Sequence, residues 1–416
     1  MTETLGQRPW MTAPPTAAVM DALEAAGGTD CARFVGGCVR NSLVGRPVDD
    51  IDIATVLTPE AVTRAVEAAG LRAVPTGVDH GTITAIAGGQ PFEITTLRRD
   101  VSTDGRRAVV AFTSDWDEDA RRRDFTLNAL YARRDGSLVD PTGDGAADAR
   151  AGRIVFVGDP EQRLREDYLR ILRFFRFLAW YGKGAPDAAA LAACARLKDR
   201  VTTLAAERIS KELLKLLAAD DPRQATGLML EAGVLEMMLP EPINLERFKG
   251  LVEIETDLLF EADPLLRLAA LLPDDQLTAM RLAESLRLSN AERDRLVAAL
   301  APLPKLKSWM SPREIRQAVY REGKAAFRDR AKLAWAAADR TAVTPQWRGM
   351  IALAEGWTVP EFPLSGEEVL AAGVPKGPMV GQVMREVEAW WIDHDFIDDK
   401  LSAIEKLKAV AQGMAY

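Results

Sequence analysis

The sequence predicts an α+β N-terminal domain, with a small mixed and mostly antiparallel sheet, followed by an all-helical remainder. Three observations lead to this fold class. Polar and apolar residues alternate in several short segments before residue 140, as in half-buried strands. After residue 157 this alternation nearly vanishes and apolar residues recur with helical spacing. Proline- and glycine-rich breaks then separate successive helical segments, which indicates several helical modules.

The elements of the N-terminal domain follow from local signals. Thr16 can cap a helix over residues 17–26, and a Gly-Gly pair ends it. A strand over residues 33–35 runs into a second Gly-Gly pair, after which residues 38–44 form helical turns. Further strands are expected over residues 50–54, 73–75, 80–87 and 91–97, with a helix over residues 59–69.

The helical half has longer elements and few strand signals. Its first helix is expected over residues 161–181, where apolar residues repeat every three or four positions. Helices over residues 187–197, 204–218 and 222–232 follow, and helical segments continue to the C-terminus.

Composition limits the possible classes of protein. No apolar run approaches the roughly 18 residues of a membrane helix, and the N-terminus lacks the pattern of a signal peptide. The three cysteines favour reduced thiols, so we expect a cytoplasmic protein without membrane contact. With only two histidines, a histidine-rich metal site is excluded. Any metal must be held by carboxylates, which favour Mg²⁺ or Mn²⁺.

Charge is unevenly distributed along the chain. The net charge is −8, but every cation between residues 98 and 176 is an arginine. Arginine presents a planar fork that matches phosphate oxygens better than lysine does. This stretch therefore favours a phosphate-bearing ligand, although solvated surface charge is an alternative.

Gly36, Gly37 and Arg40 lie where the first strand passes into a helix. Glycine allows the backbone to approach a phosphate closely, and the N–H groups at a helix start favour an anion. Arg40 could add a positive charge for a triphosphate. Since ordinary turns also use glycine pairs, this motif is weak by itself.

Asp50 and Asp52 are two residues apart on a predicted strand, which places their carboxylates on one face. Adjacent negative charges are unfavourable unless a cation lies between them, and a divalent ion resolves this. Glu93, on a neighbouring predicted strand, is a candidate third carboxylate. Exposed carboxylates on an edge strand remain the alternative.

Arg123, Asp124 and Asn128 lie in the segment RRDFTLNAL. The arginine can bind phosphate, and the carboxylate can hold a ribose hydroxyl. On a helix, Asp124 and Asn128 would share a face. The alternative is a helix start with a charged first turn.

Asp167 and Arg170 are three residues apart on the predicted helix 161–181 and would project from one face. An acceptor beside a donor matches the base edges of cytosine and adenine, whereas guanine and uracil show the reverse polarity. Arg173 and Arg176 continue the arginines along this helix. The alternative is an intrahelical salt bridge.

In order along the chain, these motifs resemble those of the class II tRNA nucleotidyltransferases (CCA-adding enzymes) and the related bacterial poly(A) polymerases. The segments that carry the resemblance are VGGCVRNSLVGRPVDDIDIAT, RRDFTLNAL, DPTGDGAADARAGRI, REDYLRILRFFRF and ERISKELLKLL. The resemblance divides the chain into a nucleotidyltransferase head, a neck that recognises the base, a body and a tail that binds tRNA. These domains are expected over residues 1–145, 146–220, 221–330 and 331–416.

The resemblance also implies roles for residues. Two Mg²⁺ ions would be held by Asp50 and Asp52, with Glu93 as a third catalytic carboxylate. The base would be read by Asp167 and Arg170. The rest of the nucleotide would be bound by Gly36, Gly37, Arg40, Arg123, Asp124, Asn128, Arg173 and Arg176.

The implied reaction adds C, C and A to the 3′ end of tRNA from CTP and ATP, with release of pyrophosphate. The alternatives are polyadenylation, addition of two cytidines only, and a non-catalytic RNA-binding relative. The polar stretch over residues 100–119 is expected to be the flexible loop that favours full CCA addition. One departure is Asn41, where the family usually has aspartate.

Overall fold

The structure is a computed structural model that describes residues 3–77, 81–103, 108–257, 260–338 and 340–413. The chain divides into two compact units, Met1–Leu239 and Pro240–Tyr416. The boundary lies within residues 221–330, which the sequence assigns to one domain. The division into head, neck, body and tail stays a prediction.

The first unit contains a seven-stranded sheet. Strands β2 and β5 run parallel, and the other neighbouring strands of this sheet are antiparallel. The predicted small, mostly antiparallel sheet is therefore confirmed. In spatial order the strands are β3 (Arg72–Gly77), β4 (Thr82–Ala87), β5 (Gln90–Thr96), β2 (Asp52–Thr55), β1 (Ala32–Val35), β8 (Tyr131–Ala132) and β9 (Leu138–Val139).

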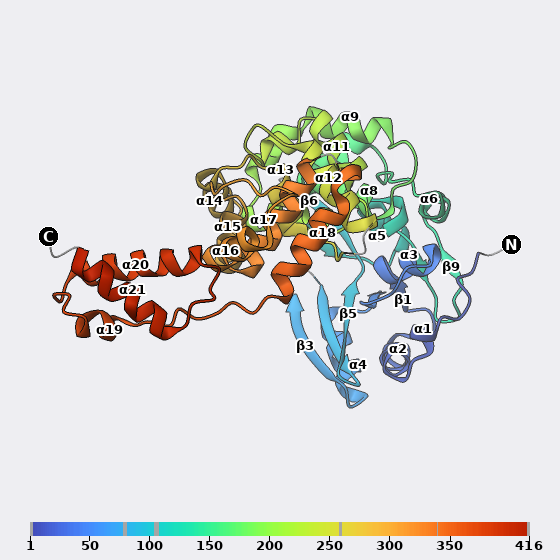
Figure 1. Ribbon diagram of the computed structural model, residues 1–416. Coiled ribbons are helices and arrows are strands. Elements are labelled where there is room, and N and C mark those ends of the chain that lie inside the picture. The colour runs from blue at the N-terminus through green and yellow to red at the C-terminus, as the bar shows by residue number, and fades with distance from the viewer. Residues whose placement is uncertain (1–2, 78–80, 104–107, 258–259, 339, 414–416) are drawn as a thin grey trace. The chain divides into compact units, whose positions relative to one another are not determined.

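Two helices, α2 (Pro14–Gly27) and α4 (Pro59–Ala68), pack against each other and against this sheet (Figure 1). Helix α4 begins where the Thr58 hydroxyl accepts the Ala61 N–H at 3.3 Å. Apolar side chains of the helix and the strands are fully buried between them, among them Val62, Ile53 and Ile94. Shorter helices of this part are α1 (Pro9–Thr12), α3 (Gly37–Val44), α5 (Trp116–Arg121) and α6 (Gly145–Ala151).

The predicted loop over residues 100–119 contains regular structure. Strands β6 (Arg98–Thr103) and β7 (Ala108–Phe112) pair antiparallel, and α5 follows them. Thr113 continues the connection by donating its N–H to the Leu97 carbonyl at 3.0 Å. The polar composition of this stretch did not reveal these elements, because backbone groups make the pairing. The tip, residues 104–107, lies outside the described residues.

The helical part of the first unit corrects one predicted element. The expected helix over residues 161–181 is two helices, α7 (Pro160–Glu166) and α8 (Leu169–Tyr181). Asp167 lies between them in an extended conformation, with its carboxylate accepting the Leu169 N–H at 3.0 Å. This local bond competes with helical continuation. The remaining α-helices of the unit are α9 (Ala188–Arg196), α10 (Ala206–Leu217) and α11 (Arg223–Glu231).

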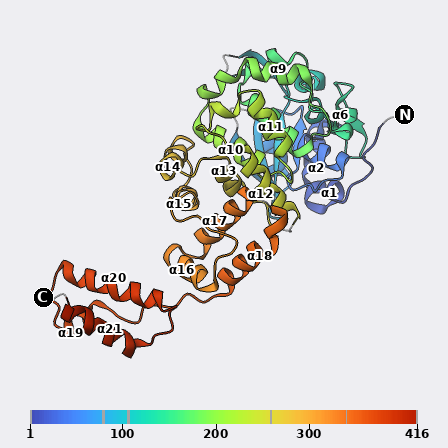
Figure 2. The same ribbon diagram turned by 45° about the horizontal axis from the view of Figure 1, so that its top comes forward.

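The described residues of the second unit form helices and connecting loops and no strand, as predicted. Its last three helices lie together (Figure 2). The side chains of Val369, Val383 and Leu407 belong to the buried apolar cluster that these helices form. The helices are α12 (Leu245–Asp257), α13 (Pro264–Leu271), α14 (Gln276–Ser285), α15 (Asn290–Ala299), α16 (Pro312–Glu322), α17 (Lys324–Ala337), α18 (Arg340–Gly356), α19 (Gly366–Ala371), α20 (Pro378–Asp393) and α21 (Lys400–Gly413).

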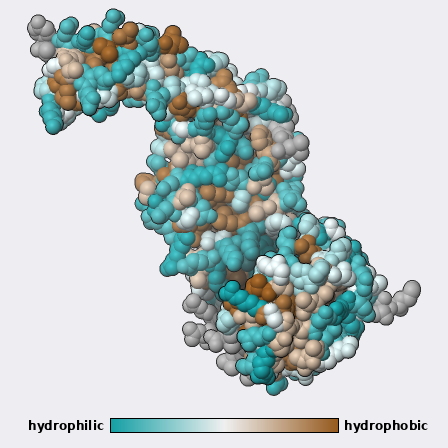
Figure 3. All heavy atoms as spheres, turned by 90° about the horizontal axis from the view of Figure 1, so that it is seen from below, coloured by the Kyte–Doolittle hydropathy of each residue, from teal (hydrophilic) through white to brown (hydrophobic). Residues whose placement is uncertain are grey.

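The surface is mixed in character. Figure 3 shows hydrophilic side chains over much of one face, with hydrophobic ones scattered between them. None of the helices formed by the described residues has the length and hydropathy to cross a membrane. The three cysteines are free and buried, consistent with the expected reduced thiols.

Candidate active site

The glycine motif forms the turn between β1 and α3. Gly36 has φ +68°, a left-handed conformation that glycine adopts readily, and α3 begins at the next residue. Two guanidinium groups flank the turn. A β-carbon on Gly36 would lie 4.0 Å from Arg123 Nη1, and one on Gly37 would lie 3.8 Å from Arg40 Nη2. The helix start and both cations therefore face the place where the sequence predicts phosphates.

Asp52 and Glu93 are directly opposite each other on the parallel strands β2 and β5. The expectation that Glu93 lies on a strand beside Asp52 is correct. Burial raises the pKa of Asp52 to about 6, with further contributions from the charges of Glu93 and Asp50. A divalent cation would offset this repulsion, so the donor set fits Mg²⁺ or Mn²⁺.

Asp50 departs from the predicted strand geometry. Strand β2 begins at Asp52, because pairing with β5 begins there, and Asp50 lies before it and is exposed. The alternation of a strand therefore does not position its carboxylate. Among the described residues, no three acidic, histidine or cysteine side chains are already gathered as metal ligands.

Arg40 is buried and held on several sides. Its Nη1 donates to Asn128 Oδ1 at 2.6 Å, and its Nη2 donates to the Tyr181 hydroxyl at 2.7 Å. Its guanidinium carbon lies 4.1 Å from the centre of the Tyr181 ring. Burial lowers the pKa of Arg40, an effect that Tyr181 and Asp124 partly oppose. Arg40 thus joins the glycine turn to α8, where Tyr181 lies.

Asn41 has a structural role at the position where the family usually has aspartate. Its Oδ1 accepts from Arg40 Nη2 at 3.0 Å and from the Tyr181 hydroxyl at 3.1 Å. Its amide donates to the Pro47 carbonyl at 2.8 Å. A carboxylate could accept the first two bonds but could not donate the third.

Asp124 and Asn128 do not share an α-helix face, which corrects the sequence interpretation. Asp124 precedes a 3₁₀ turn, Thr126–Asn128, of which Asn128 is the last residue, and Asn128 Nδ2 donates to Asp124 Oδ1 at 2.9 Å. Both are buried. Arg173 Nε donates to Asp124 Oδ2 at 2.8 Å. Burial raises the pKa of Asp124, but the charge and hydrogen bonds of Arg173 and Asn128 lower it to about 2.

Arg173 and Arg176 are committed to partners within the protein. Arg176 Nε donates to Glu212 Oε2 on α10 at 2.6 Å, and Arg173 Nη1 lies 4.0 Å from Glu212 Oε1. Since Arg173 also pairs with Asp124, these arginines connect α8 with the residues of the 3₁₀ turn and with α10. Sequence reasoning missed Glu212, although it is the acidic residue within the apolar stripe of ERISKELLKLL.

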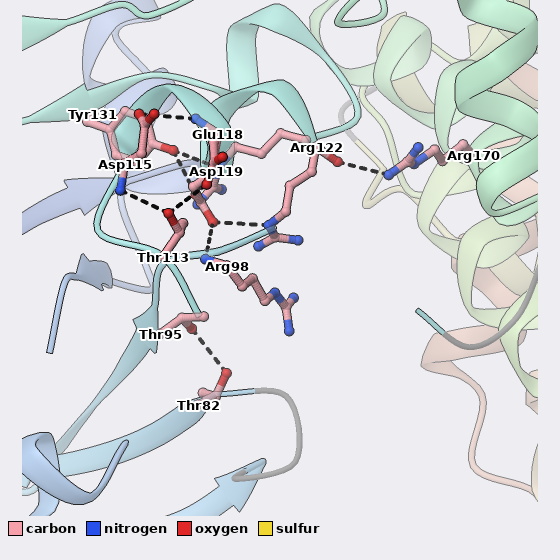
Figure 4. Close-up of polar contacts among 11 residues, drawn as sticks. Thr82, Thr95, Arg98, Thr113, Asp115, Glu118, Asp119, Arg122, Tyr131 and Arg170 are labelled. Carbon is pink, nitrogen blue, oxygen red and sulfur yellow. Dashed lines mark hydrogen bonds and ion pairs between the residues drawn. The ribbon is translucent and has the colours of Figure 1, made fainter. Parts of the chain in front are cut away.

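Asp167 and Arg170 do not pair with each other, so the intrahelical salt bridge is excluded as their interaction. Asp167 Oδ2 accepts from Arg208 Nη2 at 2.8 Å. Arg170 Nη1 donates to Glu166 Oε2 at 2.6 Å, and Nη2 donates to the Arg122 carbonyl at 3.0 Å (Figure 4). Each side chain is thus held in place by a different neighbour.

Two family models match the chain. The one described as Poly A polymerase head domain matches residues 32–155. The one described as Probable RNA and SrmB- binding site of polymerase A matches residues 185–244.

Curated relatives match along most of their length. CCA tRNA nucleotidyltransferase 1, mitochondrial, of Mus musculus is 33% identical over 90% of this chain and 86% of its own. The protein of the same name in Homo sapiens is 32% identical with the same shares. The CCA-adding enzyme of Latilactobacillus sakei is 29% identical over 89% of this chain and 91% of its own.

Solved structures share the fold. The Bacillus stearothermophilus CCA-adding enzyme in complex with CTP aligns with a TM-score of 0.76 and 24% identity, covering 97% of this chain and 99% of its own. The Thermotoga maritima CCA-adding enzyme complexed with tRNA aligns with a TM-score of 0.64 and 20% identity, covering 92% of this chain and 91% of its own.

Proposed function

This chain belongs to the CCA tRNA nucleotidyltransferase family and is a nucleotidyltransferase, and we propose that it adds C, C and A to the 3′ end of tRNA, using CTP and ATP and releasing pyrophosphate. The observation that carries the proposal is the likeness to enzymes of that name over most of the chain. Solved structures of the same fold hold CTP in one case and tRNA in another.

The reaction would take place beside β2 and β5. Asp50 and Asp52 would hold Mg²⁺, and Glu93 would lie beside them. When bound, the metal would activate the RNA 3′-hydroxyl and stabilise the departing pyrophosphate. Support comes from the raised pKa of Asp52, which reflects burial and two neighbouring carboxylates.

The nucleotide would lie between the glycine turn and α8. The N–H groups at the start of α3, at Gly36 and Gly37, and the Arg123 guanidinium would bind the triphosphate. Arg40 and Asn128 are hydrogen-bonded to each other and would shape this pocket rather than move freely. Asp124, Arg173 and Arg176 would fix the distance between the turn and the helix through their ion pairs.

Base selection would rest on Asp167 and Arg170. A carboxylate acceptor and a guanidinium donor accept the edges of cytosine and adenine, and they disfavour guanine and uracil. The contacts with Arg208 and the Arg122 carbonyl support this proposal, because they restrict both side chains before a base arrives.

The test is incubation of the full-length protein with CTP, ATP, Mg²⁺ and a tRNA that lacks its 3′ CCA. We expect three added nucleotides and then a stop, and Asp50→Ala should abolish transfer while tRNA binding persists. A long run of adenosines would instead support polyadenylation. This second candidate is favoured by the family model for residues 32–155, which is described as a Poly A polymerase head domain. Two added cytidines would indicate a CC-adding enzyme, and no incorporation would overturn the proposal.

The cytoplasmic location stays a prediction. Relatives from mouse and human are named as mitochondrial forms. Cell fractionation with an antibody against the full chain would test it.

A further inference from the structure

Asp119 is a buried carboxylate that the proposed reaction does not use. It lies in α5 and is 1% exposed. Oδ2 accepts hydrogen bonds from Arg123 Nη2 at 2.8 Å, from Arg123 Nε at 3.1 Å and from the Tyr131 hydroxyl at 2.7 Å. Oδ1 accepts from Arg122 Nε at 3.0 Å and from the Arg98 N–H at 3.3 Å (Figure 4). The Asp119 carboxylate therefore accepts hydrogen bonds from several donor groups at once.

The Oδ2 side of Asp119 determines how Arg123 is oriented. Oδ2 of Asp119 accepts from Nε and Nη2 of Arg123, and this Nε also lies 3.2 Å from the Tyr131 hydroxyl. Within the described part of the chain, Nη1 makes no hydrogen bond. It is the atom that lies 4.0 Å from the position of a β-carbon on Gly36. The guanidinium thus keeps one edge on Asp119 and presents the other to the glycine turn.

Electrostatics favours this arrangement. Burial by itself raises the pKa of Asp119, but the charges of Arg123 and Arg122 outweigh it and hold the pKa well below the usual range. Burial would lower the pKa of Arg123, yet Asp119 and Tyr131 raise it. A buried, charge-assisted pair with fixed hydrogen-bond geometry has few alternative orientations.

Tyr131 is itself held in place. Its ring packs edge-on against Trp116, with centroids 5.2 Å apart, and the side chain is fully buried on β8. The hydroxyl therefore has a defined position relative to Asp119 and Arg123. Replacement by phenylalanine removes this hydroxyl and keeps the ring contact.

We propose that Asp119 and Tyr131 are positioning residues that aim Arg123 Nη1 at the triphosphate of the incoming nucleotide. The inference rests on the proposed function, because it takes the glycine turn as the triphosphate site. Asp119 and Tyr131 would act through Arg123 and not through contact with the nucleotide.

The test measures nucleotide affinity by titration calorimetry with CTP and with CMP, which share the base and ribose but differ in phosphate number. Tyr131→Phe should weaken CTP binding about three- to tenfold and leave CMP binding nearly unchanged. Asp119→Asn should weaken CTP binding by tenfold or more, since it also disturbs the Oδ1 contacts. In turnover with tRNA, KM for CTP should rise more than kcat falls for Tyr131→Phe.

A double-mutant cycle separates positioning from a merely structural effect. In an Arg123→Ala background, Tyr131→Phe should cause no further loss of CTP affinity, because the cation that it aims is gone. Equal additional loss in that background, or equal weakening of CTP and CMP, would overturn the proposal. If Asp119→Asn fails to fold, Tyr131→Phe alone decides the outcome.

Asp148→Asn is the matched control. Asp148 is also a buried aspartate of the first unit. It accepts hydrogen bonds from Arg153 Nε at 2.8 Å and from the Thr126 hydroxyl at 2.7 Å, and it makes no hydrogen bond or ion pair with Arg123. This variant should lower thermal stability and leave the ratio of CTP to CMP affinity unchanged. If the wild type adds no nucleotide to tRNA, the proposed function fails. If it adds nucleotides while Tyr131→Phe leaves CTP affinity unchanged, only this inference fails.

Discussion

Several buried side chains in this protein carry charges that would destabilise the fold if no opposite charge lay beside them. Asp124 and Asp119 are compensated by arginines, and their pKa values are lowered. Asp52 is the contrasting case, because burial and two neighbouring carboxylates raise its pKa. A buried acidic group without a cation is costly for folding. The metal proposed at Asp52 would therefore contribute to stability as well as to chemistry.

Asp52→Asn should reveal this cost in the metal-free protein. The folded-state pKa of about 6 lies above the ordinary value of 3.8, so the wild type loses stability as pH rises through this interval. Above pH 6 we expect the variant to be more stable by on the order of 1–3 kcal/mol. Denaturant unfolding between pH 4 and 8 measures the difference.

The effect of magnesium on the free energy of unfolding tests Asp52 in a second way. It should raise the stability of the wild type at pH 7.5 and leave Asp52→Asn unchanged. Parallel pH profiles for the two proteins, or equal stabilisation of both by magnesium, would show that Asp52 is neither strained nor a metal ligand.

At the scale of elements, ion pairs set how α8 lies against its neighbours. Arg173 joins α8 to Asp124 beside the 3₁₀ turn, and Arg176 joins α8 to Glu212 on α10. The break at Asp167 separates α8 from α7. Asp159 caps the start of α7, and the Asp167 carboxylate accepts the Leu169 N–H at the start of α8. The residues proposed to read the base and those proposed to hold the triphosphate are therefore linked through one helix.

Arg173→Ala should destabilise the first unit strongly, because it leaves the buried Asp124 carboxylate without its cation. Removing one partner of such a pair typically costs about 3–5 kcal/mol. Arg165→Ala is the matched control. Arg165 pairs with Glu161 at 2.6 Å, but its side chain is 56% exposed, and such pairs contribute about 0–1 kcal/mol. Similar losses for both variants in chemical denaturation would contradict this account.

At the scale of the whole molecule, the chain contains two compact units that differ in secondary structure. The first unit, Met1–Leu239, contains the sheet and every residue proposed for catalysis and nucleotide binding. The second unit has its own core and its own buried ion pair, in which Arg267 Nε donates to Glu255 Oε2 at 2.6 Å. Its helices therefore have a source of stability independent of the nucleotide.

Calorimetry of the full chain should show this independence. We expect more than one unfolding transition, since each unit contains a cluster of buried apolar side chains of its own. CTP with magnesium should raise the transition of the first unit by about 5–10 °C at a hundredfold excess over Kd. The transition of the second unit should stay within about 1 °C, because no proposed contact with CTP or magnesium lies there. A single transition that moves as a whole would argue for one cooperative unit instead.

Local patterns were sufficient for the fold class, the glycine turn and the strands that carry Asp52 and Glu93. Strand alternation, glycine conformation and capping involve residues close in the sequence, so their physical causes are visible there. The partners of Arg173 and Arg176, Asp124 and Glu212, were decided by tertiary structure alone. A guanidinium pairs with whichever carboxylate the packing of distant elements brings within reach, and sequence spacing does not encode that distance. The break at Asp167 is intermediate between these cases. The hydrogen bond from the Leu169 N–H to the Asp167 carboxylate is local, but helical periodicity on both sides concealed the break.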